Sequence, residues 1–383
     1  MGFLSRCMMS EEIMSNATDL DWDSPDFQRL RQSMLDGKWD SPGCDNCRMK
    51  EETGAKSQRQ NWLTAQKRHF VDGAYDNPQI TGNTVRHLFL NFNNVCNFKC
   101  RMCSPRYSNS LIPEHRHLKN TTMPNLRFDE SQYKNINNVM NFLEFNRDRL
   151  KDVVSIWITG GEPFIDNTMF QVNEILKEYA KPEQISMSIT TNGSRISVDQ
   201  LDVFNCYKQI HFDLSMDTPG PMFEYMRSAG IYTWPEFDKF VDELAEYRRD
   251  NMKWLLVSLN SSYQVFNATR IKELYEYTYD KLGENHVNHR LVIGPKHFQA
   301  RQTPDSVKQT ANQKIDELLQ ATWLDDHDTR MIEDARKMLN RPVELDQWKI
   351  FVKQCIGQDK FRGTDLREYD PILGEEVYTW QSN

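Results

Sequence analysis

Three features are scarce in this sequence of 383 residues: long apolar runs, basic charge and cysteine. No apolar run approaches the roughly 18 residues that a membrane-spanning helix needs, so no such helix is expected. The formal net charge is −8, whereas a protein that binds duplex nucleic acid usually carries a basic balance or a basic face. Eight cysteines are too few for a disulfide scaffold, so clustered cysteines are better interpreted as metal or catalytic ligands.

The amino-terminal stretch MGFLSRCMMSEE lacks the apolar core of a secretory signal peptide, because acidic residues follow at once. Hydrophobic residues make up 38% of the chain and charged residues 27%, which is typical of a globular protein. The length fits two or three domains, or one large core with additions. We therefore expect a cytoplasmic protein without a membrane segment and without a nucleic-acid partner.

Short apolar segments alternate with helical patterns from about residue 85 onward. The segments are VRHLFLNF (85–92), DVVSIWIT (152–159), QISMSITT (184–191), QIHFDLSM (209–216), WLLVSLN (254–260) and HRLVIGP (289–295). Between them, Ser197 with Gln200 and Thr233 with Glu236 form capping-box patterns. Six such segments predict parallel βα units, with strands that are almost continuously apolar. A partial barrel and an open sheet both fit this number.

The chain after Gly294 is predicted to be helical and polar. Ile315, Leu318 and Leu319 indicate one amphipathic helix. The stretch QCIGQDKFRGTDLREYDPILGEE near the end is interpreted as a turn-rich cover or tail.

Three cysteines crowd one loop directly after the first predicted strand. Cys96, Cys100 and Cys103 form a Cys-x3-Cys-x2-Cys pattern at the carboxyl end of that strand, where α/β proteins place their sites. A structural zinc site usually has four ligands, often in two Cys-x2-Cys pairs. Three thiolates can instead hold three corners of a four-iron cluster, which leaves the fourth iron open to another ligand.

This loop and the residues at the later strand ends resemble the radical S-adenosylmethionine (SAM) superfamily. The resemblance implies a partial (β/α)6 TIM barrel over residues 81–296 and a [4Fe-4S] cluster held by the three cysteines. It also implies that SAM binds the open iron and is split to a 5′-deoxyadenosyl radical, which abstracts a hydrogen from a substrate. A reductant such as flavodoxin or ferredoxin would supply the electron.

The segment ITGGEPF (158–164) resembles the GGEP motif of this family, whose glycines let the backbone approach SAM and whose acid meets the amino group of SAM. An acid directly after two glycines is hard to explain by packing, so a functional role is favoured for Glu162. Structural roles remain an alternative for Asn192, Ser215, Asp217 and Arg227. The resemblance implies these SAM-binding residues: Gly160, Gly161, Glu162, Pro163, Asn192, Ser215 and Asp217 (ribose), Arg227 (carboxylate), Asn260 and Ile293 (adenine).

Upstream, Cys44-x2-Cys47 and Gly2-x4-Cys7 resemble the auxiliary-cluster modules known as SPASM and twitch domains. The resemblance implies such a module over residues 1–80 and a second iron–sulfur cluster on Cys7, Cys44 and Cys47. Its fourth ligand stays open between Cys355, an exogenous ligand and a residue upstream of Met1. Zinc on Cys44 and Cys47, or no metal, is the alternative. Burial in the core is favoured for both Cys206 and Cys355.

Relatives with auxiliary clusters often modify peptides or proteins, so we expect a peptide or protein substrate. A small molecule or a nucleotide is the second hypothesis. A non-catalytic iron–sulfur scaffold or redox sensor is a third, although a scaffold has no use for the GGEP motif. The sequence identifies no catalytic residue that acts on the substrate. Residues 297–383 are expected to form a mostly helical extension.

Overall fold

The computed structural model describes residues 85–133, 139–251, 253–283 and 287–381, together with separate short pieces between residues 3 and 60. The chain forms two compact units. One consists of Met1–Leu90, Ile136–Ile156 and Phe170–Ile185, and the other of Asn91–Asn135, Trp157–Met169 and Ser186–Asn383. The three cysteines of the loop and the later strand ends that resemble the SAM motifs all belong to the second unit.

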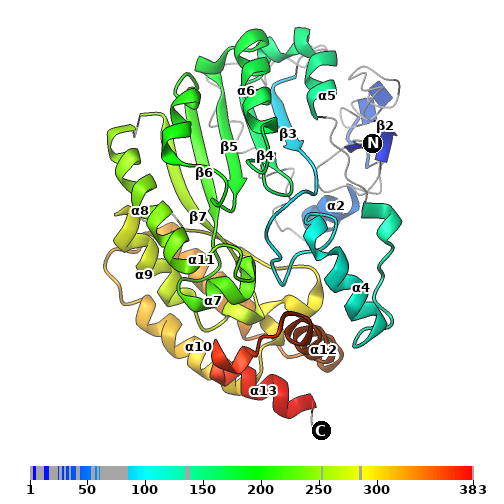
Figure 1. Cartoon of the computed structure of the whole chain (residues 1–383), viewed down its shortest axis with the longest axis vertical. Coiled ribbons are helices and arrows are strands. Elements are labelled where there is room, and N and C mark those ends of the chain that lie inside the picture. Colours follow the sequence, from blue (N-terminus) through cyan, green and yellow to red (C-terminus); the bar gives the residue numbers. More distant parts are fainter. Residues whose placement is uncertain are drawn as a thin grey trace. The chain divides into compact units, whose positions relative to one another are not determined.

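Six strands form one sheet in the order in which they occur in the chain (Figure 1). They are β3 (His87–Asn91), β4 (Ser155–Thr159), β5 (Ser186–Thr191), β6 (Gln209–Ser215), β7 (Leu255–Tyr263) and β8 (Val287–Leu291). The pairings from β5 to β8 are parallel. The predicted parallel α/β fold with six strands is therefore confirmed. Two strand ends differ from the prediction, because β7 continues to Tyr263 beyond Asn260 and β8 ends before Ile293.

A separate small sheet pairs β1 (Phe3–Ser5) with β2 (Ile13–Asn16). Some of the helices connect successive strands of the six-stranded sheet. The helices are α2 (Asp45–Glu52), α4 (Ile112–Asn120), α5 (Val139–Phe145), α6 (Thr168–Tyr179), α7 (Pro221–Phe223), α8 (Trp234–Asn251), α9 (Ile271–Leu282), α10 (Asp305–Leu318), α11 (Asp326–Leu339), α12 (Leu345–Arg362) and α13 (Pro371–Gln381). Both predicted capping boxes are present, since Ser197 pairs with Gln200 and the Thr233 backbone N–H donates to Glu236 at 2.7 Å.

The strands are less continuously apolar than the sequence analysis expected. Along β5, buried positions alternate with half-buried Ser186, Ser188 and Thr190. The Ser188 hydroxyl donates to buried Asp213 on β6 at 3.2 Å, and a ring nitrogen of His211 lies 2.9 Å from the Ser258 hydroxyl on β7. These strands thus carry a polar side as well as an apolar one, which is why their pattern alternates.

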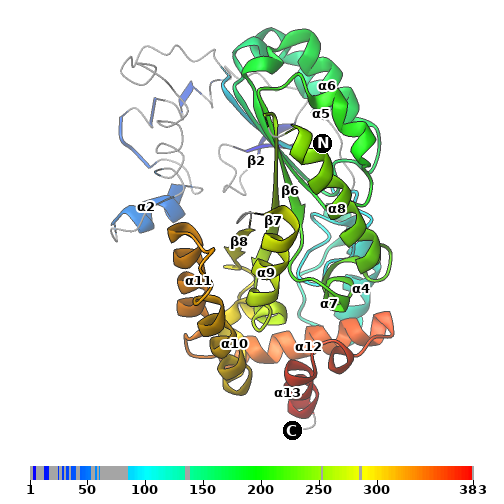
Figure 2. The ribbon, with the colours of Figure 1, turned by 90° about the vertical axis from the view of Figure 1, so that its left-hand side faces the viewer.

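The C-terminal part contains helices α10 to α13, so the expected mostly helical extension is confirmed. Its end is helical as well, where a turn-rich cover or tail was expected. Helices α9, α10 and α11 pack in succession (Figure 2). Helix α12 crosses α4 at Gly357, where an added Cβ would lie 2.3 Å from the Thr122 hydroxyl. Apolar and polar residues of α12 are both buried, so no amphipathic period marks it in the sequence.

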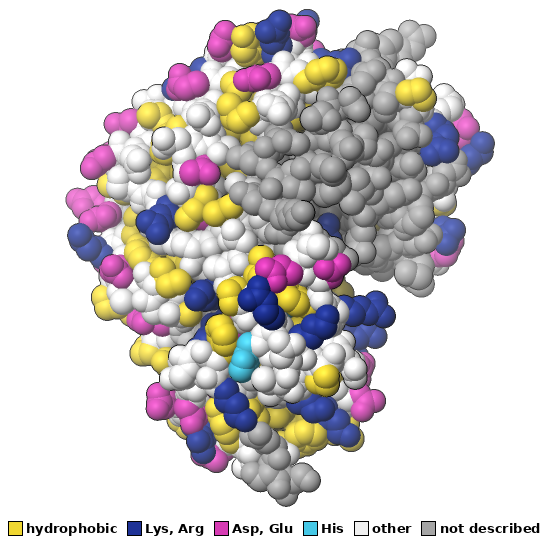
Figure 3. All heavy atoms as spheres, turned by 45° about the vertical axis from the view of Figure 1, so that its right-hand side comes forward, with side chains coloured by type: hydrophobic (Ala, Val, Ile, Leu, Met, Phe, Trp, Pro, Cys, Tyr) yellow, Lys and Arg dark blue, Asp and Glu magenta, His cyan; other side chains and the backbone are white. Residues whose placement is uncertain are grey.

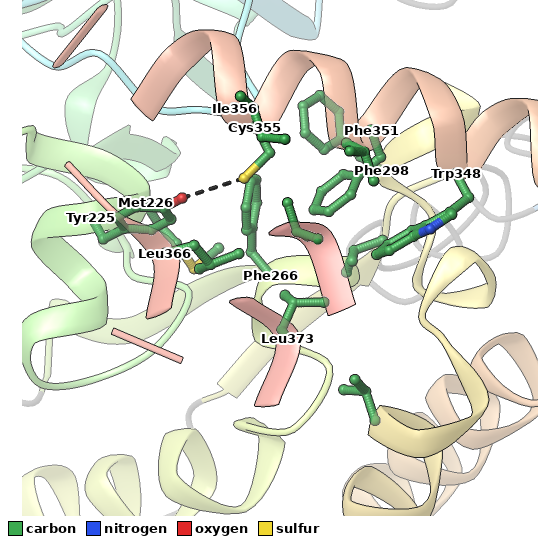
Figure 4. Packing of buried hydrophobic residues seen from close by; sticks show 14 of the residues in the cluster. Tyr225, Met226, Phe266, Phe298, Trp348, Phe351, Cys355, Ile356, Leu366 and Leu373 are labelled. Atoms are coloured by element: carbon green, nitrogen blue, oxygen red, sulfur yellow. Dashed lines mark hydrogen bonds between the residues drawn. The ribbon is translucent and has the colours of Figure 1, made fainter. Parts of the chain in front are cut away.

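An apolar cluster joins α12 and α13 to the segment after β6 (Figure 4). Figure 4 shows Cys355 among Phe266, Phe351 and Ile356, with its sulfur 3.5 Å from the Tyr225 hydroxyl. Cys355 is 1% exposed, so the expectation of a core cysteine is confirmed for it. The same expectation is wrong for Cys206, which is exposed because it follows the turn of residues 198–204 rather than packing under it.

The surface carries both signs of charge. On the face shown in Figure 3, acidic and basic side chains of the described residues are interspersed among hydrophobic and uncharged ones. Among the described residues, no helix has the length and apolar character needed to cross a bilayer.

Candidate functional site

The three cysteines of the loop line one cavity of about 180 Å³. Cys96, Cys100 and Cys103 come from the loop between β3 and α4. The other predicted site residues that line this cavity are Gly160, Gly161, Glu162, Asn192, Ser215 and Arg227. Tertiary structure thus brings the ends of β4, β5 and β6 to the cysteine loop, as the order of parallel strands requires.

Local hydrogen bonds shape the cysteine loop itself. The Cys103 backbone N–H donates to the Cys100 carbonyl at 3.0 Å and closes a turn between these two ligand candidates. Phe98 is 1% exposed, and its carbonyl accepts from the Ser108 hydroxyl at 2.7 Å. The Phe98 backbone N–H also approaches the Cys96 sulfur at 3.4 Å. The loop is therefore folded around the buried side chain of Phe98. The thiols of the loop line the cavity.

Burial raises the pKa of all three thiols, that of Cys103 to about 12. The guanidinium of Arg227 opposes this for Cys100, whose sulfur lies 3.9 Å from Arg227 Nη1. Thiolates in such a place need further positive charge, which bound iron would supply. No three His, Cys, Asp or Glu side chains of the described residues group as ligands for a single metal ion. Three thiols that line one cavity fit a polynuclear cluster with an open corner.

Glu162 is held by donors from the strand beside it. Its carboxylate accepts from the Thr191 hydroxyl at 2.6 Å, from the Asn192 backbone N–H at 2.7 Å and from the Phe164 backbone N–H at 3.2 Å. Burial raises its pKa to about 7, while these donors act in the opposite direction. Glu162 therefore ties the loop after β4 to the end of β5, a structural role that the sequence analysis did not foresee.

The two glycines of the motif allow the loop after β4 to pack on the cysteine loop. The Gly161 backbone N–H donates to the Asn93 carbonyl at 2.7 Å. A Cβ on Gly161 would lie 2.0 Å from the Val95 carbonyl oxygen, and Gly160 has a φ of +137° that favours glycine. The close approach of the loop after β4 to the cysteine loop is thus one reason why residue 161 is glycine. Approach to a cofactor would be a second reason.

A Gly161→Ala variant is expected to be destabilised by about 1–3 kcal/mol, because its methyl group meets backbone that cannot rotate away. Urea unfolding measures this loss. Gly294→Ala is the control, since an added Cβ at Gly294 meets nothing within 4 Å. Equal unfolding midpoints for the two variants would contradict the packing role of Gly161.

Asn192 joins the turn after β5 to the cysteine loop. Its amide nitrogen donates to the Asn97 side-chain oxygen at 3.0 Å and lies 3.9 Å from the Cys96 sulfur. Its amide oxygen accepts from the Ser194 backbone N–H at 2.9 Å. Asn192 is therefore next to the first thiol of the loop.

Asp217 lies beneath Arg227 rather than on the cavity wall. It is 1% exposed, forms an ion pair with Arg227 Nε at 2.7 Å and accepts from the Ser262 backbone N–H at 2.7 Å. Pro163, Asn260 and Ile293 do not line the cavity either. Asn260 lies within β7, with its carbonyl bonded to the Met216 N–H, and the side chain of Ile293 is 70% exposed after β8.

The auxiliary residues lie elsewhere in the chain. Cys7 is outside the described residues. Cys44 directly precedes α2 and Cys47 lies in its first turn, with Cys47 buried and Cys44 half-buried. A spacing of three places both side chains on one side of the helix start.

Helix α12 contacts the cysteine loop through buried polar residues, which the sequence did not predict. Arg101, inside the loop, is fully buried and pairs with Asp359 at 2.8 Å. The Gln358 amide donates to the Arg101 carbonyl at 3.1 Å. Arg362 donates to the Lys99 carbonyl at 2.6 Å and pairs with Glu114 at 2.7 Å. The one sign of this contact in the sequence is the mostly polar segment QDKFR (358–362), which follows apolar residues of the same helix.

Met102, also in the cysteine loop, contacts the C-terminal helices as well. Its side chain is partly buried against the apolar cluster of α12 and α13. The residue before the third cysteine thus contributes to packing of the loop on the C-terminal helices.

Comparison with known proteins agrees with this geometry. The family model described as the Radical SAM superfamily matches residues 90–283, half of the chain. A GTP 3′,8-cyclase from Sinorhizobium medicae (strain WSM419) is 25% identical over 202 residues, 52% of this chain and 50% of that protein. The chain therefore spans about half the length of the curated relative that it matches.

Solved structures give lower similarity. The structure described as native anSMEcpe with bound AdoMet has 15% identity and a TM-score of 0.37, and the match covers 61% of this chain and 61% of that one. Streptococcus suis SuiB bound to S-adenosylmethionine has 15% identity and a TM-score of 0.39, and the match covers 73% of this chain and 59% of that one. With the cysteine loop, the GGEP loop and the match over half of its length, this chain belongs to the radical SAM superfamily.

Proposed function

We propose that this protein is a radical SAM enzyme that cleaves SAM reductively and abstracts a hydrogen from a substrate. One observation carries the proposal: the three thiols of a Cys-x3-Cys-x2-Cys loop share a cavity with the GGEP loop and Arg227. Gly161 and Glu162 also have structural contacts, but a scaffold that only stores a cluster does not need a cavity that the GGEP loop and Arg227 line together with the thiols.

The chain's own residues have distinct parts in this proposal. Cys96, Cys100 and Cys103 hold the cluster, and the cavity walls from the ends of β4, β5 and β6 hold SAM. Arg227 pairs with Asp217 through Nε and would bind the SAM carboxylate with its terminal nitrogens. When bound, the cluster would supply the electron for reductive cleavage of SAM, and SAM would supply the group that takes the substrate hydrogen.

The test is anaerobic reconstitution with iron and sulfide, followed by dithionite and SAM. Formation of 5′-deoxyadenosine, measured by chromatography, is expected from the loaded protein. Its complete absence from protein with a full cluster would instead support an iron–sulfur scaffold or redox sensor. In the cell we propose flavodoxin or ferredoxin as the reductant and the cytoplasm as the compartment.

We propose a peptide or protein as the substrate. The support is the Cys44-x2-Cys47 pair at the start of α2, which resembles the auxiliary modules of peptide-modifying relatives. A nucleotide is the second candidate, because the curated relative is named a GTP 3′,8-cyclase. Incubation with GTP and with a peptide library, each followed by mass spectrometry, distinguishes the two.

We also propose a second iron–sulfur cluster in a SPASM-like or twitch-like module on Cys7, Cys44 and Cys47. The burial of Cys355 in the apolar cluster argues against it as the fourth ligand, so an exogenous ligand or an upstream residue is favoured.

Iron and acid-labile sulfide assays test the second cluster. About eight irons per chain are expected from two four-iron clusters. A Cys44→Ala, Cys47→Ala double variant is expected to retain about four, because the loop cluster does not depend on this pair. About four irons in the unmodified protein would remove the second cluster from the proposal.

A further inference from the structure

The six-stranded sheet has one apolar face and one mostly polar face. On the apolar face, residues such as Ile158, Ile189 and Phe212 are fully buried. On the other face, the alternate positions of the same strands are half-buried and mostly polar, as Ser188 and Thr190 of β5 are. Parallel strands that are covered by protein on both faces are usually apolar on both. The polar face is therefore suited to contact with water or with a hydrophilic ligand.

The polar face extends to the cavity of the thiols. Thr159, Thr190 and Ser215 lie at or near the carboxyl ends of β4, β5 and β6, and they line that cavity. Trp157 precedes Thr159 by two residues, so it points to the same face of β4. Its indole N–H donates to the Thr190 hydroxyl at 3.4 Å. Trp157 is thus next to the wall of the cavity in which SAM is proposed to bind.

Arg290 brings a positive charge to this place. It lies on β8, and its guanidinium carbon is 5.1 Å from the centre of the Trp157 ring. The side chain is exposed, and within the described part of the chain it forms no ion pair with a carboxylate. An arginine over an aromatic ring keeps the edge of its guanidinium available for a carboxylate or a phosphate, which it can bind through two parallel N–H groups.

Asp213, the acidic residue of β6 on this face, is already occupied by its neighbours. It is 2% exposed, and its carboxylate accepts from the Ser188 hydroxyl at 3.2 Å and from the Ser258 hydroxyl. Nε2 of His211 lies 3.4 Å from the same carboxylate. The negative charge of Asp213 is therefore stabilised within the sheet, whereas the guanidinium of Arg290 has no such partner. An anionic group is the ligand that this part of the face lacks.

We propose that Arg290, held over Trp157, binds a carboxylate or a phosphate group of the substrate. The bound group anchors the substrate beside the cavity in which SAM is proposed to bind. This inference rests on the proposed function, because it takes the anchored molecule to be the substrate, and it adds the chemical class of that substrate. A carboxylate would come from an acidic side chain of a peptide and a phosphate from a nucleotide.

Fluorine NMR of the reconstituted protein, labelled with 5-fluorotryptophan, tests the site. The cluster stays oxidised, and neither SAM nor reductant is added. The Trp157→Phe variant identifies the resonance of Trp157 among those of the nine tryptophans. N-acetylaspartate amide and UMP are the anionic probes, and N-acetylasparagine amide and uridine are their neutral counterparts at equal ionic strength. The Trp157 resonance is expected to shift with the concentration of an anionic probe and not with that of its neutral counterpart.

Arg290→Gln is expected to weaken the apparent affinity for the anionic probe about tenfold, because charge-assisted hydrogen bonds are lost. Arg249→Gln makes the same charge change at an exposed position near the end of α8 and is expected to bind as the unmodified protein does. Both side chains are exposed, so both variants are expected to fold. The comparison of charged and neutral probes in the unmodified protein depends on neither variant.

Two results would overturn the proposal. One is a Trp157 resonance that responds to neither anionic probe, or responds equally to the charged and the neutral member of each pair. The other is an equal affinity for the anionic probe in Arg290→Gln and Arg249→Gln. A response to N-acetylaspartate amide alone assigns a carboxylate, and a response to UMP alone assigns a phosphate. Because no 5′-deoxyadenosine is measured, failure here is distinguishable from failure of the proposed SAM cleavage.

Discussion

A Cys100→Ala variant is expected to form no 5′-deoxyadenosine above background and to lose about four irons per chain relative to the parent protein. Cys100 is the central thiol of the loop, and the turn between its carbonyl and the Cys103 N–H brings two of the three proposed ligands together. Two remaining thiols cannot hold a cluster that needs three protein corners. Iron analysis and product chromatography after anaerobic reconstitution measure both losses.

The control for this variant is Cys206→Ala. Cys206 is exposed and does not line the cavity of the thiols, so its removal is expected to change neither iron content nor product. Retention of product by Cys100→Ala, with iron still bound, would refute the assignment of Cys100 as a ligand. Loss of product by both variants would show instead that cysteine substitution harms the protein in general.

An Asp359→Ala variant is expected to lose about 3–5 kcal/mol of the free energy of unfolding. The carboxylate pairs with Arg101 at 2.8 Å and also accepts from the Thr364 hydroxyl at 2.7 Å and the Tyr378 hydroxyl at 2.9 Å. Its removal leaves the Arg101 charge buried without compensation, directly inside the cysteine loop. Urea unfolding measures the loss, and a lower iron content is expected to accompany it.

Asp365→Ala is the matched control, because Asp365 also pairs with an arginine, Arg367 at 2.6 Å, but in a more exposed place. It is expected to change stability by about 1 kcal/mol or less. An Arg101→Met, Asp359→Leu double variant is expected to recover most of the stability that Asp359→Ala loses, since no unpaired charge remains. If Asp359→Ala were no less stable than Asp365→Ala, the buried pair would not be what holds the loop.

Sequence reasoning predicted the parts of the site that depend on strand ends. Parallel strands in chain order bring their carboxyl ends to one edge, so the motifs after β3, β4, β5 and β6 meet there whatever the details of packing. Asn260 and Ile293 were also predicted to bind SAM, but neither residue lines the cavity. Strand β7 continues past the former, and the latter lies exposed after β8. Both differences are a few residues at strand ends, where periodicity carries least information.

The sequence by itself determined the parallel α/β fold, the three-thiol loop and the glycine-rich motif, because these depend on residue type and on spacing along the chain. Only the tertiary structure decided what surrounds them. Glu162 bonds to the end of β5, Gly161 must be small because Val95 lies against it, and α12 reaches back to Arg101 across more than half of the chain. Such contacts join residues that no local period relates, so they exist only once the chain has folded.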